Sequence, residues 1–214
     1  MKKYVTRSIV FLAFISALCS ADAVAIGQFM VCRPIFCAPL IGFLMGDIGA
    51  GVWIGMITEM IWINTVPIGV NVPVDVSIVS ILSTFWMCKY FTGLCESGIW
   101  GLILAVPFAY LYRVISVFRR NFNTRIMHWV ERGIRNGKYK RVDTGIIAGL
   151  FFFVAKAFLF YVFSMFVGGR IYELVYQKLP LFVLEGFYKA WYLLPICGFG
   201  AVICNFRKTP FLRR

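Results

Sequence analysis

The stretch that decides the fold of this chain runs from Arg33 to Ser83 and reads RPIFCAPLIGFLMGDIGAGVWIGMITEMIWINTVPIGVNVPVDVSIVSILS. After Arg33 it contains no lysine or arginine. It nevertheless carries three carboxylates, Asp47, Glu59 and Asp75. An unpaired carboxylate is costly in hydrocarbon, so a membrane protein keeps one where it faces a cavity, a partner or a ligand. We therefore expect these side chains to lie inside a helical bundle.

Glycine and proline interrupt this apolar stretch in two places. Asp47 lies in the sequence GDIGAG, and Asp75 ends the sequence PIGVNVPVD, which cannot all lie inside one regular helix. Irregular backbone at membrane depth occurs only where it lines a cavity or packs within protein. Interrupted apolar segments of this kind point to the binding site of a transporter. We expect residues Gly46–Gly51 and Pro67–Asp75 to be non-helical and buried among helices.

The order of these motifs carries a family resemblance over about a quarter of the chain. The matching positions are Arg33-Pro34, Gly42, Gly46-Asp47, the glycine-rich run to Gly55, Glu59-Met60-Ile61, Pro67-Ile68-Gly69, Pro73 and Asp75. They resemble the IIC membrane component of the mannose/fructose/sorbose family of bacterial sugar phosphotransferase systems. The resemblance implies an all-α, multi-pass protein of the bacterial inner membrane, with broken or re-entrant helices around a midplane site. It also implies a permease subunit that binds and translocates a hexose-type sugar.

The composition independently predicts an integral membrane protein. Hydrophobic residues make up 61% of the 214 residues, aromatic residues 18%, and the mean hydropathy is +0.82. The net charge of +13 is concentrated beside apolar segments, with three basic residues in the first seven, nine from Arg113 to Arg141 and four in the last eight. This positive-inside pattern places the last two clusters in the cytoplasm, next to anionic lipid. It does not resemble the alternating basic and stacking aromatic residues of a nucleic-acid-binding surface.

No motif for phosphoryl transfer or metal binding is present in the sequence. The chain has a single histidine, His128, and its seven cysteines form no C-x-x-C pair. It also lacks the phosphate-cradling G-x-x-x-x-G-K-[ST] motif. We therefore expect no cofactor, no metal and no enzymatic activity. The resemblance assigns phosphoryl transfer to cytoplasmic IIA/IIB partner proteins and implies a IID-type partner in the membrane.

We expect residues 1–214 to form one membrane domain. It would comprise N-terminal helices with the broken segments over residues 1–112, a basic cytoplasmic loop over 113–144 and C-terminal helices over 145–214. The N-terminus resembles a secretory signal, but apolar sequence continues past Ala25, so we interpret residues Ser8–Val31 as a retained membrane segment, with signal cleavage as the alternative. Residues Ile35–Gly46 and Gly51–Ile63 are each short for a span of about 20 residues and form either a helical hairpin or one broken pair.

Two features of the second half carry further expectations. Apolar residues of the basic loop recur at every third or fourth position, which predicts a basic amphipathic helix lying on the membrane surface. Residues Gly145–Val167 form a full-length span with one charge, Lys156, which is either paired within the bundle or displaced toward an interface. Residues Gly168–Lys189 are amphipathic, and residues Trp191–Phe206 form the last apolar segment.

Sugar binding needs carboxylates and amides that exchange hydrogen bonds with hydroxyls, beside an aromatic face such as Trp53 or Trp62. The candidate sugar ligands are Glu59, Asp75, Asn64, Asn71 and Gln28. The candidate structural residues are Arg33, Pro34, Asp47 and Gly69. The alternative for Glu59 and Asp75 is that they pair with Arg33 or cap the broken helices, as we expect Asp47 to do.

Three departures from the family pattern keep a second hypothesis open. Cys32 and Pro67 stand where family members often have a histidine and a small polar loop, and the sequence ends soon after Phe206 where family members continue with further membrane segments. The chain is then either a sugar permease subunit or a diverged or truncated membrane scaffold or regulatory protein of the same fold that does not transport.

Overall fold

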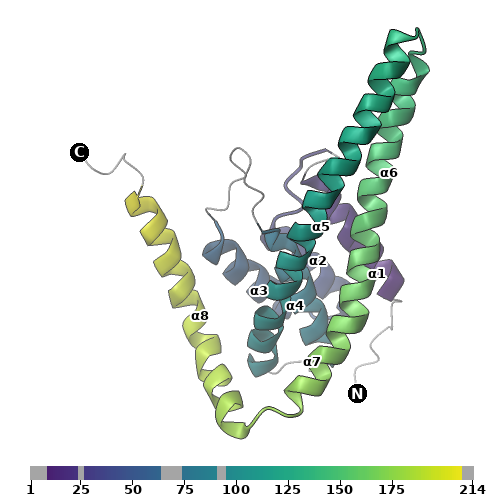
Figure 1. The fold of residues 1–214 in the computed structure, drawn as a ribbon. Coiled ribbons are helices and arrows are strands. Elements are labelled where there is room, and N and C mark those ends of the chain that lie inside the picture. Colours follow the sequence, from purple (N-terminus) through teal and green to yellow (C-terminus); the bar gives the residue numbers. More distant parts are fainter. Residues whose placement is uncertain (1–8, 24–26, 64–73, 91–94, 209–214) are drawn as a thin grey trace.

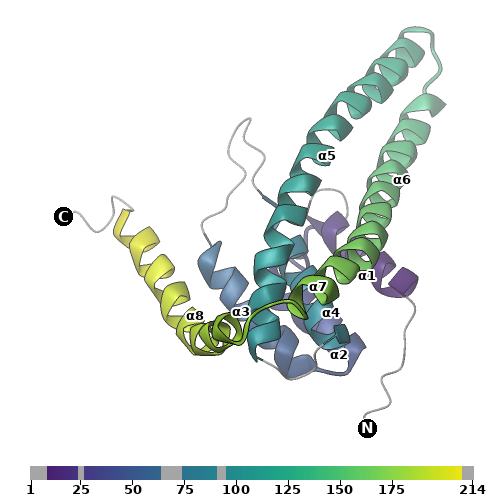
Figure 2. The same cartoon turned by 60° about the horizontal axis from the view of Figure 1, so that its bottom comes forward.

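The protein is all-α. The computed structural model describes residues 9–23, 27–63, 74–90 and 95–208, which contain helices and turns and no strand (Figure 1). The elements, in chain order, are α1 (Ile9–Asp22), α2 (Pro34–Met45), α3 (Ile48–Ile61), α4 (Val76–Tyr90), α5 (Cys95–Arg135), α6 (Lys140–Phe163), the π-helical turn η1 (Ser164–Gly168), α7 (Gly169–Tyr176) and α8 (Leu181–Lys208). The short helices α1 to α4 form a bundle, from which α5 and α6 project side by side as a long hairpin (Figures 1 and 2).

Helix α4 lies at the centre of the bundle. Every residue from Ser77 to Cys88 is buried, so the helix has no exposed face over this length. Its side chains pack in one cluster with residues of α1, α2, α5, α6, η1 and α7. A helix that is buried all round must be apolar or small on every face, which explains the mixture of β-branched residues and serines in this sequence. Gly101 of α5 packs directly against Ser83 of α4.

Helices α2 and α3 form a hairpin, the first of the two arrangements that the sequence leaves open. Helix α2 ends at Gly46 in the left-handed conformation (φ 88°), and the Asp47 N–H donates to the Gly42 carbonyl (2.8 Å). The Asp47 side chain then accepts a hydrogen bond from the Ala50 N–H (3.1 Å) and is the N-cap of α3. The expectation that Gly46–Gly51 is non-helical and buried is therefore only partly right. Gly46 and Asp47 are non-helical, but this cap lets the helix resume at Ile48, and Gly46 is exposed.

Glycines bring the backbones of this hairpin into contact. A Cβ added at Gly51 would lie 2.5 Å from the Ala38 carbonyl oxygen, and one added at Gly55 would lie 2.6 Å from the Pro34 carbonyl oxygen. A Cβ at Gly42 would lie 2.5 Å from the Asp47 carbonyl oxygen. Since the obstructing atoms are backbone atoms, no side-chain rotation can relieve such a clash. The glycine spacing of this stretch thus sets the distance between α2 and α3.

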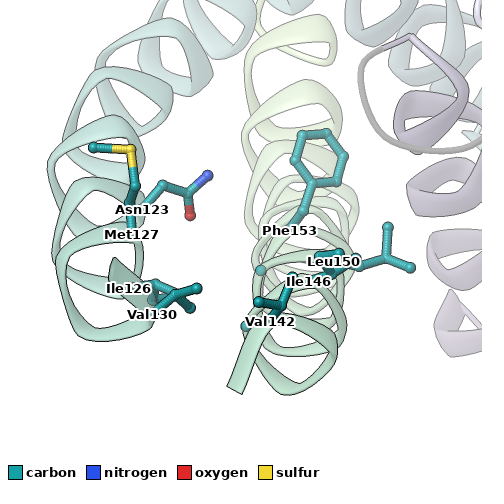
Figure 3. A pocket seen from close by; sticks show the side chains of 10 residues that line it. Asn123, Ile126, Met127, Val130, Val142, Ile146, Leu150 and Phe153 are labelled. Carbon is teal, nitrogen blue, oxygen red and sulfur yellow. The ribbon is translucent and has the colours of Figure 1, made fainter. Parts of the chain in front are cut away.

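The basic segment is helical, as predicted, but it does not form a helix of its own. It continues α5, which runs unbroken for 41 residues from the apolar segment to Arg135. Helix α6 packs back along it, and a cavity of about 460 Å³ lies between the two helices (Figure 3). The lining is apolar apart from Asn123 and comprises Ile126, Met127, Val130, Val142, Gly145, Ile146, Gly149, Leu150 and Phe153. No proline occurs between Pro107 and Arg135, so no proline breaks α5 between its apolar part and its basic part.

The remaining boundaries also differ from those that hydropathy predicts. Helix α1 stops at Asp22, well short of Val31. The amphipathic segment after Gly168 is divided between α7 and α8, and α8 begins at Leu181 and is continuous with the last apolar segment. Helix α8 lies on the far side of the bundle from α6 (Figure 1), where its Trp191 packs with Ile54 of α3 and Ile99 of α5.

Among the described residues, three helical stretches are long and apolar enough to cross a membrane. They are Cys95–Arg135, Lys140–Tyr176 and Leu181–Cys204. The helices α1 to α4 are shorter apolar helices of 12 to 15 residues. This combination of full-length and short apolar helices fits the predicted multi-pass membrane protein.

Candidate functional site

The carboxylates Glu59 and Asp75 stand on two different segments that meet at Cys32 and Arg33. Arg33 is the N-cap residue of α2, and Pro34 follows it in the first turn, where the absence of an N–H costs no hydrogen bond. The Arg33 side chain reaches Glu59 in the last turn of α3, and the Cys32 carbonyl accepts a hydrogen bond from the Ser77 hydroxyl at the start of α4. One dipeptide therefore ties the end of α3 to the beginning of α4.

Glu59 has one paired and one unpaired carboxylate oxygen. Arg33 Nη1 donates to Glu59 Oε1 at 3.2 Å, and the two side chains are 44% and 17% exposed. Glu59 Oε2 is buried and has no hydrogen-bond partner among the described residues. A buried acceptor without a donor is unfavourable, so this oxygen lacks a hydrogen bond that a folded protein normally supplies. The pairing of Glu59 with Arg33 is one of the two alternatives that the sequence leaves open.

Asp75 is half-buried immediately before α4. Its Oδ1 accepts a hydrogen bond from the Ser77 N–H (3.2 Å), and its backbone carbonyl accepts one from the Ile78 N–H (3.2 Å). It therefore caps α4, the structural alternative that the sequence also leaves open. Lys156 of α6 is close enough to interact electrostatically with the Asp75 carboxylate.

Lys156 itself is held inside the bundle. Its Nζ donates to Ser116 Oγ of α5 at 3.0 Å and lies 4.0 Å from the centroid of the Tyr112 ring. The sequence leaves open whether this lysine is paired within the bundle or displaced toward an interface, and the structure shows that it is paired. The hydroxyl and the ring face both stabilise the ammonium away from water.

The other predicted residues are placed as follows. Gln28 is exposed in the segment between α1 and α2, where its backbone is left-handed (φ 55°). Asn64, Asn71 and Gly69 lie outside the described residues. Of the two candidate aromatic faces, Trp53 points toward α8, with its ring centroid 6.0 Å from that of Trp191, and Trp62 follows the last residue of α3.

Sequence reasoning missed the part played by Asp22. This carboxylate ends α1 and is only 6% exposed. Asp22 Oδ1 accepts a hydrogen bond from the Phe29 N–H (2.8 Å), and Oδ2 accepts one from the Cys32 N–H (3.3 Å). The signal was a carboxylate within an apolar segment, of the same kind that singled out Glu59 and Asp75.

Comparison with known proteins identifies the family. Residues 6–211 match the family described as "PTS system sorbose-specific IIC component". The chain belongs to this family. The resemblance predicted from residues 33–83 is thereby confirmed and extends over nearly the whole chain, which is a membrane-embedded transport component of a sugar phosphotransferase system.

Known proteins resemble this IIC component both in sequence and in structure. The mannose-specific EIIC component of Escherichia coli is 25% identical over 209 residues, which cover 97% of this chain and 77% of the relative. A solved structure described as "Structure of membrane protein" matches with a TM-score of 0.75 and 25% identity, covering 97% of this chain and 83% of the matched chain. A chain from a cryo-EM structure of the mannose transporter ManYZ in complex with the microcin MceA matches with a TM-score of 0.67 and 26% identity, covering 98% of this chain and 83% of that chain.

Proposed function

We propose that this IIC component binds a hexose-type sugar beside Glu59 and Asp75 and translocates it across the bacterial inner membrane. A IID-type subunit would be its membrane partner, and cytoplasmic IIA/IIB proteins would carry out the phosphoryl transfer, so that the chain itself is not an enzyme. Residues 1–214 would act as one multi-pass membrane domain. The basic segment 113–144 and the C-terminal cluster RKTPFLRR would face the cytoplasm, because lysine and arginine bias sets orientation.

The observation that carries this proposal is the buried, unpartnered Oε2 of Glu59. Its neighbour Oε1 is held by Arg33, so the carboxylate is fixed in place. A sugar hydroxyl that donates to Oε2 would supply the missing hydrogen bond, and Arg33, which is 44% exposed, could donate to a second sugar oxygen. Fixed donors and acceptors beside each other are what a polyhydroxylated ligand requires.

The remaining candidate ligands would complete the site from two sides. Gln28 precedes Arg33 in the same exposed segment and would offer an amide that both donates and accepts. Asn64 and Asn71 lie in the chain between α3 and Asp75 and would offer two further amides. A mannose-type substrate and a IID-type partner are suggested by two relatives, one called mannose-specific and one solved as part of ManYZ.

Translocation requires one part of the protein to move against another so that the site opens alternately to each side. The α2–α3 hairpin is a suitable moving unit, because the backbone contacts at Gly42, Gly51 and Gly55 keep its two helices in fixed register. Arg33 would carry the site with this unit through its contact to Glu59 of α3. The contact of the Cys32 carbonyl to Ser77 of α4 would then have to break and re-form as the unit moves.

The second candidate function is a membrane scaffold or regulator that retains the fold without transport. The Arg33–Glu59 ion pair favours it, because the same contact can simply lock the start of α2 to the end of α3. In that case Glu59 and Asp75 are structural carboxylates, one paired and one capping α4.

Sugar binding by carboxylate variants separates the two functions. Glu59→Gln keeps the shape of the side chain and removes its charge. If Glu59 binds sugar, the loss of a charge-assisted hydrogen bond, worth roughly 1.5–3 kcal/mol, should lower the affinity for mannose about ten- to a hundred-fold. Asp75→Asn should act in the same direction. The measurement is mannose binding to purified complex, normalised to folded protein.

Glu131→Gln is the matched control. Glu131 also accepts a hydrogen bond from an arginine (Arg135, 3.1 Å), but it is exposed on the α5–α6 hairpin. This control should bind mannose as the wild type does. Wild-type affinity in both Glu59→Gln and Asp75→Asn, accompanied by lower yields of folded protein, would reject the binding role in favour of the scaffold.

A further inference from the structure

The carboxylate of Asp22 fixes the backbone between α1 and α2. It is buried at the end of α1, and both of its oxygens accept hydrogen bonds from backbone N–H groups of the following segment, those of Phe29 (2.8 Å) and Cys32 (3.3 Å). Among the described residues, no lysine or arginine forms an ion pair with it. The charge of Asp22 is therefore stabilised by backbone dipoles rather than by a cation.

The segment held in this way has an unfavourable backbone conformation. Gln28 (φ 55°) and Met30 (φ 65°) are both left-handed, a conformation that residues with a Cβ rarely adopt. Gly27 beside them is also left-handed (φ 75°). Two such residues in one short segment persist only where the surroundings hold them. The two hydrogen bonds to Asp22 flank Met30 and supply that restraint.

The restraint reaches the candidate site through Cys32. Its N–H is bound to Asp22, and its carbonyl accepts from Ser77, so the residue is held on both sides. Arg33 comes next, at the N-cap of α2, with its guanidinium on Glu59. A rotation of the backbone at Cys32 would therefore move Arg33 away from Glu59.

We propose that Asp22 is a positioning residue for sugar binding, which presets the segment from Gly27 to Cys32 with its left-handed residues and thereby places Gln28 and Arg33 at the site. This inference rests on the proposed sugar site at Glu59. Asp22 makes no contact with the sugar; it lowers the cost of ordering the residues that do.

The first test measures how firmly the segment from Gly27 to Cys32 is held, and it needs no sugar. Cys32 is half-buried and serves as the reporter in a background that lacks the accessible cysteines Cys95, Cys197 and Cys204. In membrane vesicles containing the full chain, Asp22→Ala should raise the rate of Cys32 labelling by a maleimide about ten-fold, because two restraining hydrogen bonds are lost. Asp22→Asn retains one acceptor oxygen and should give an intermediate rate.

Asp47→Ala is the control for general destabilisation. It removes a helix cap of a different hairpin turn and should leave the labelling of Cys32 unchanged. An unchanged labelling rate in Asp22→Ala, or an equal increase in Asp47→Ala, would overturn the positioning role whatever the sugar measurements show.

The second test measures mannose affinity of the purified complex per folded molecule. Asp22→Ala should weaken binding about ten-fold. The substitution Met30→Gly should restore part of the loss in the Asp22→Ala background, because glycine adopts the left-handed conformation without a restraint. A purely structural role for Asp22 would lower the yield without this partial rescue of affinity.

The two proposals fail in different ways. Normal binding by Glu59→Gln with faster Cys32 labelling in Asp22→Ala would reject the sugar site and leave Asp22 as a structural restraint only, which overturns the inference. Weak binding by Glu59→Gln with normal binding by Asp22→Ala would keep the sugar site and reject Asp22. Weak binding by both variants, with the Met30→Gly rescue, supports the inference.

Discussion

The α2–α3 hairpin and the α5–α6 hairpin turn in the same way but pack differently. In each, the first helix ends at a left-handed glycine, Gly46 (φ 88°) or Gly137 (φ 71°). In each, the next N–H donates to the carbonyl five residues earlier, from Asp47 to Gly42 (2.8 Å) and from Lys138 to Gly133 (2.9 Å). Both turns are Schellman motifs, so the local chain reversal does not distinguish the hairpins.

The difference lies in what the glycines of each hairpin face. In α2–α3 a Cβ at Gly42, Gly51 or Gly55 would meet backbone atoms of the other helix or the turn. In α5–α6 a Cβ at Gly145 would meet only side-chain atoms, those of Val130 and Ile126, and one at Gly149 would meet nothing within 4 Å. The first hairpin is closed by backbone contact, whereas the second leaves a cavity of about 460 Å³ between its helices (Figure 3). Close helix packing therefore depends on where glycine falls along the helices and not on the turn that joins them.

The largest expected effect is that of Gly51→Ala. The added methyl would lie 2.5 Å from the Ala38 carbonyl oxygen, so α2 and α3 must separate, at a cost of about 3 kcal/mol or more. Thermal unfolding of the purified protein should show a large loss of stability. The matched variant is Gly145→Ala, whose methyl meets a side-chain atom of Val130 and no backbone atom. We expect a smaller loss there, because the adjoining cavity leaves room for the two helices to adjust. Equal losses in the two variants would contradict the distinction between backbone and side-chain contact.

An intermediate effect is expected where the α5–α6 hairpin joins the bundle. Ser116→Val removes the hydroxyl that accepts from Lys156 Nζ (3.0 Å) and should cost about 1 kcal/mol, because the half-buried ammonium loses a hydrogen bond. Ser116→Thr keeps the hydroxyl and is the isosteric control for the valine. Unfolding midpoints of the two variants should therefore differ; if they coincide, the hydrogen bond does not hold the base of this hairpin.

The smallest effect, and one of opposite sign, is expected for Gly149→Ala. The methyl would project into open space beside the cavity, and alanine is favoured over glycine in a helix by up to about 1 kcal/mol. The variant should unfold at the same temperature as the wild type or slightly higher. Gly55→Ala, in the other hairpin, should be clearly destabilised in the same assay. A lower unfolding temperature for Gly149→Ala would contradict the open space beside Gly149, because it would mean that the added methyl displaces another group from the α5–α6 cavity.

The amino-acid sequence alone determined those features that depend on neighbouring residues in the chain. Asp47 caps α3 through an N–H only three residues away, and the glycines from Gly42 to Gly55 bring α2 and α3 together because every turn of a helix returns to the same face. The apolar segments, their helical nature and the family could also be predicted, because each depends on residues that are close together in the chain. The boundaries could not, because hydropathy does not distinguish the apolar part of α5 from its amphipathic continuation.

Only the tertiary structure decided how the charged groups are paired. From the sequence, Glu59 and Asp75 were equal candidates for Arg33; the fold gives Arg33 to Glu59, 26 residues away, and leaves Asp75 as the cap of α4. The binding of Phe29 and Cys32 by Asp22 was equally invisible, since it requires the chain to turn back over the end of α1. A charge in an apolar environment is stabilised by whichever partner the packing brings within about 3 Å, and that distance is not encoded by spacing along the chain.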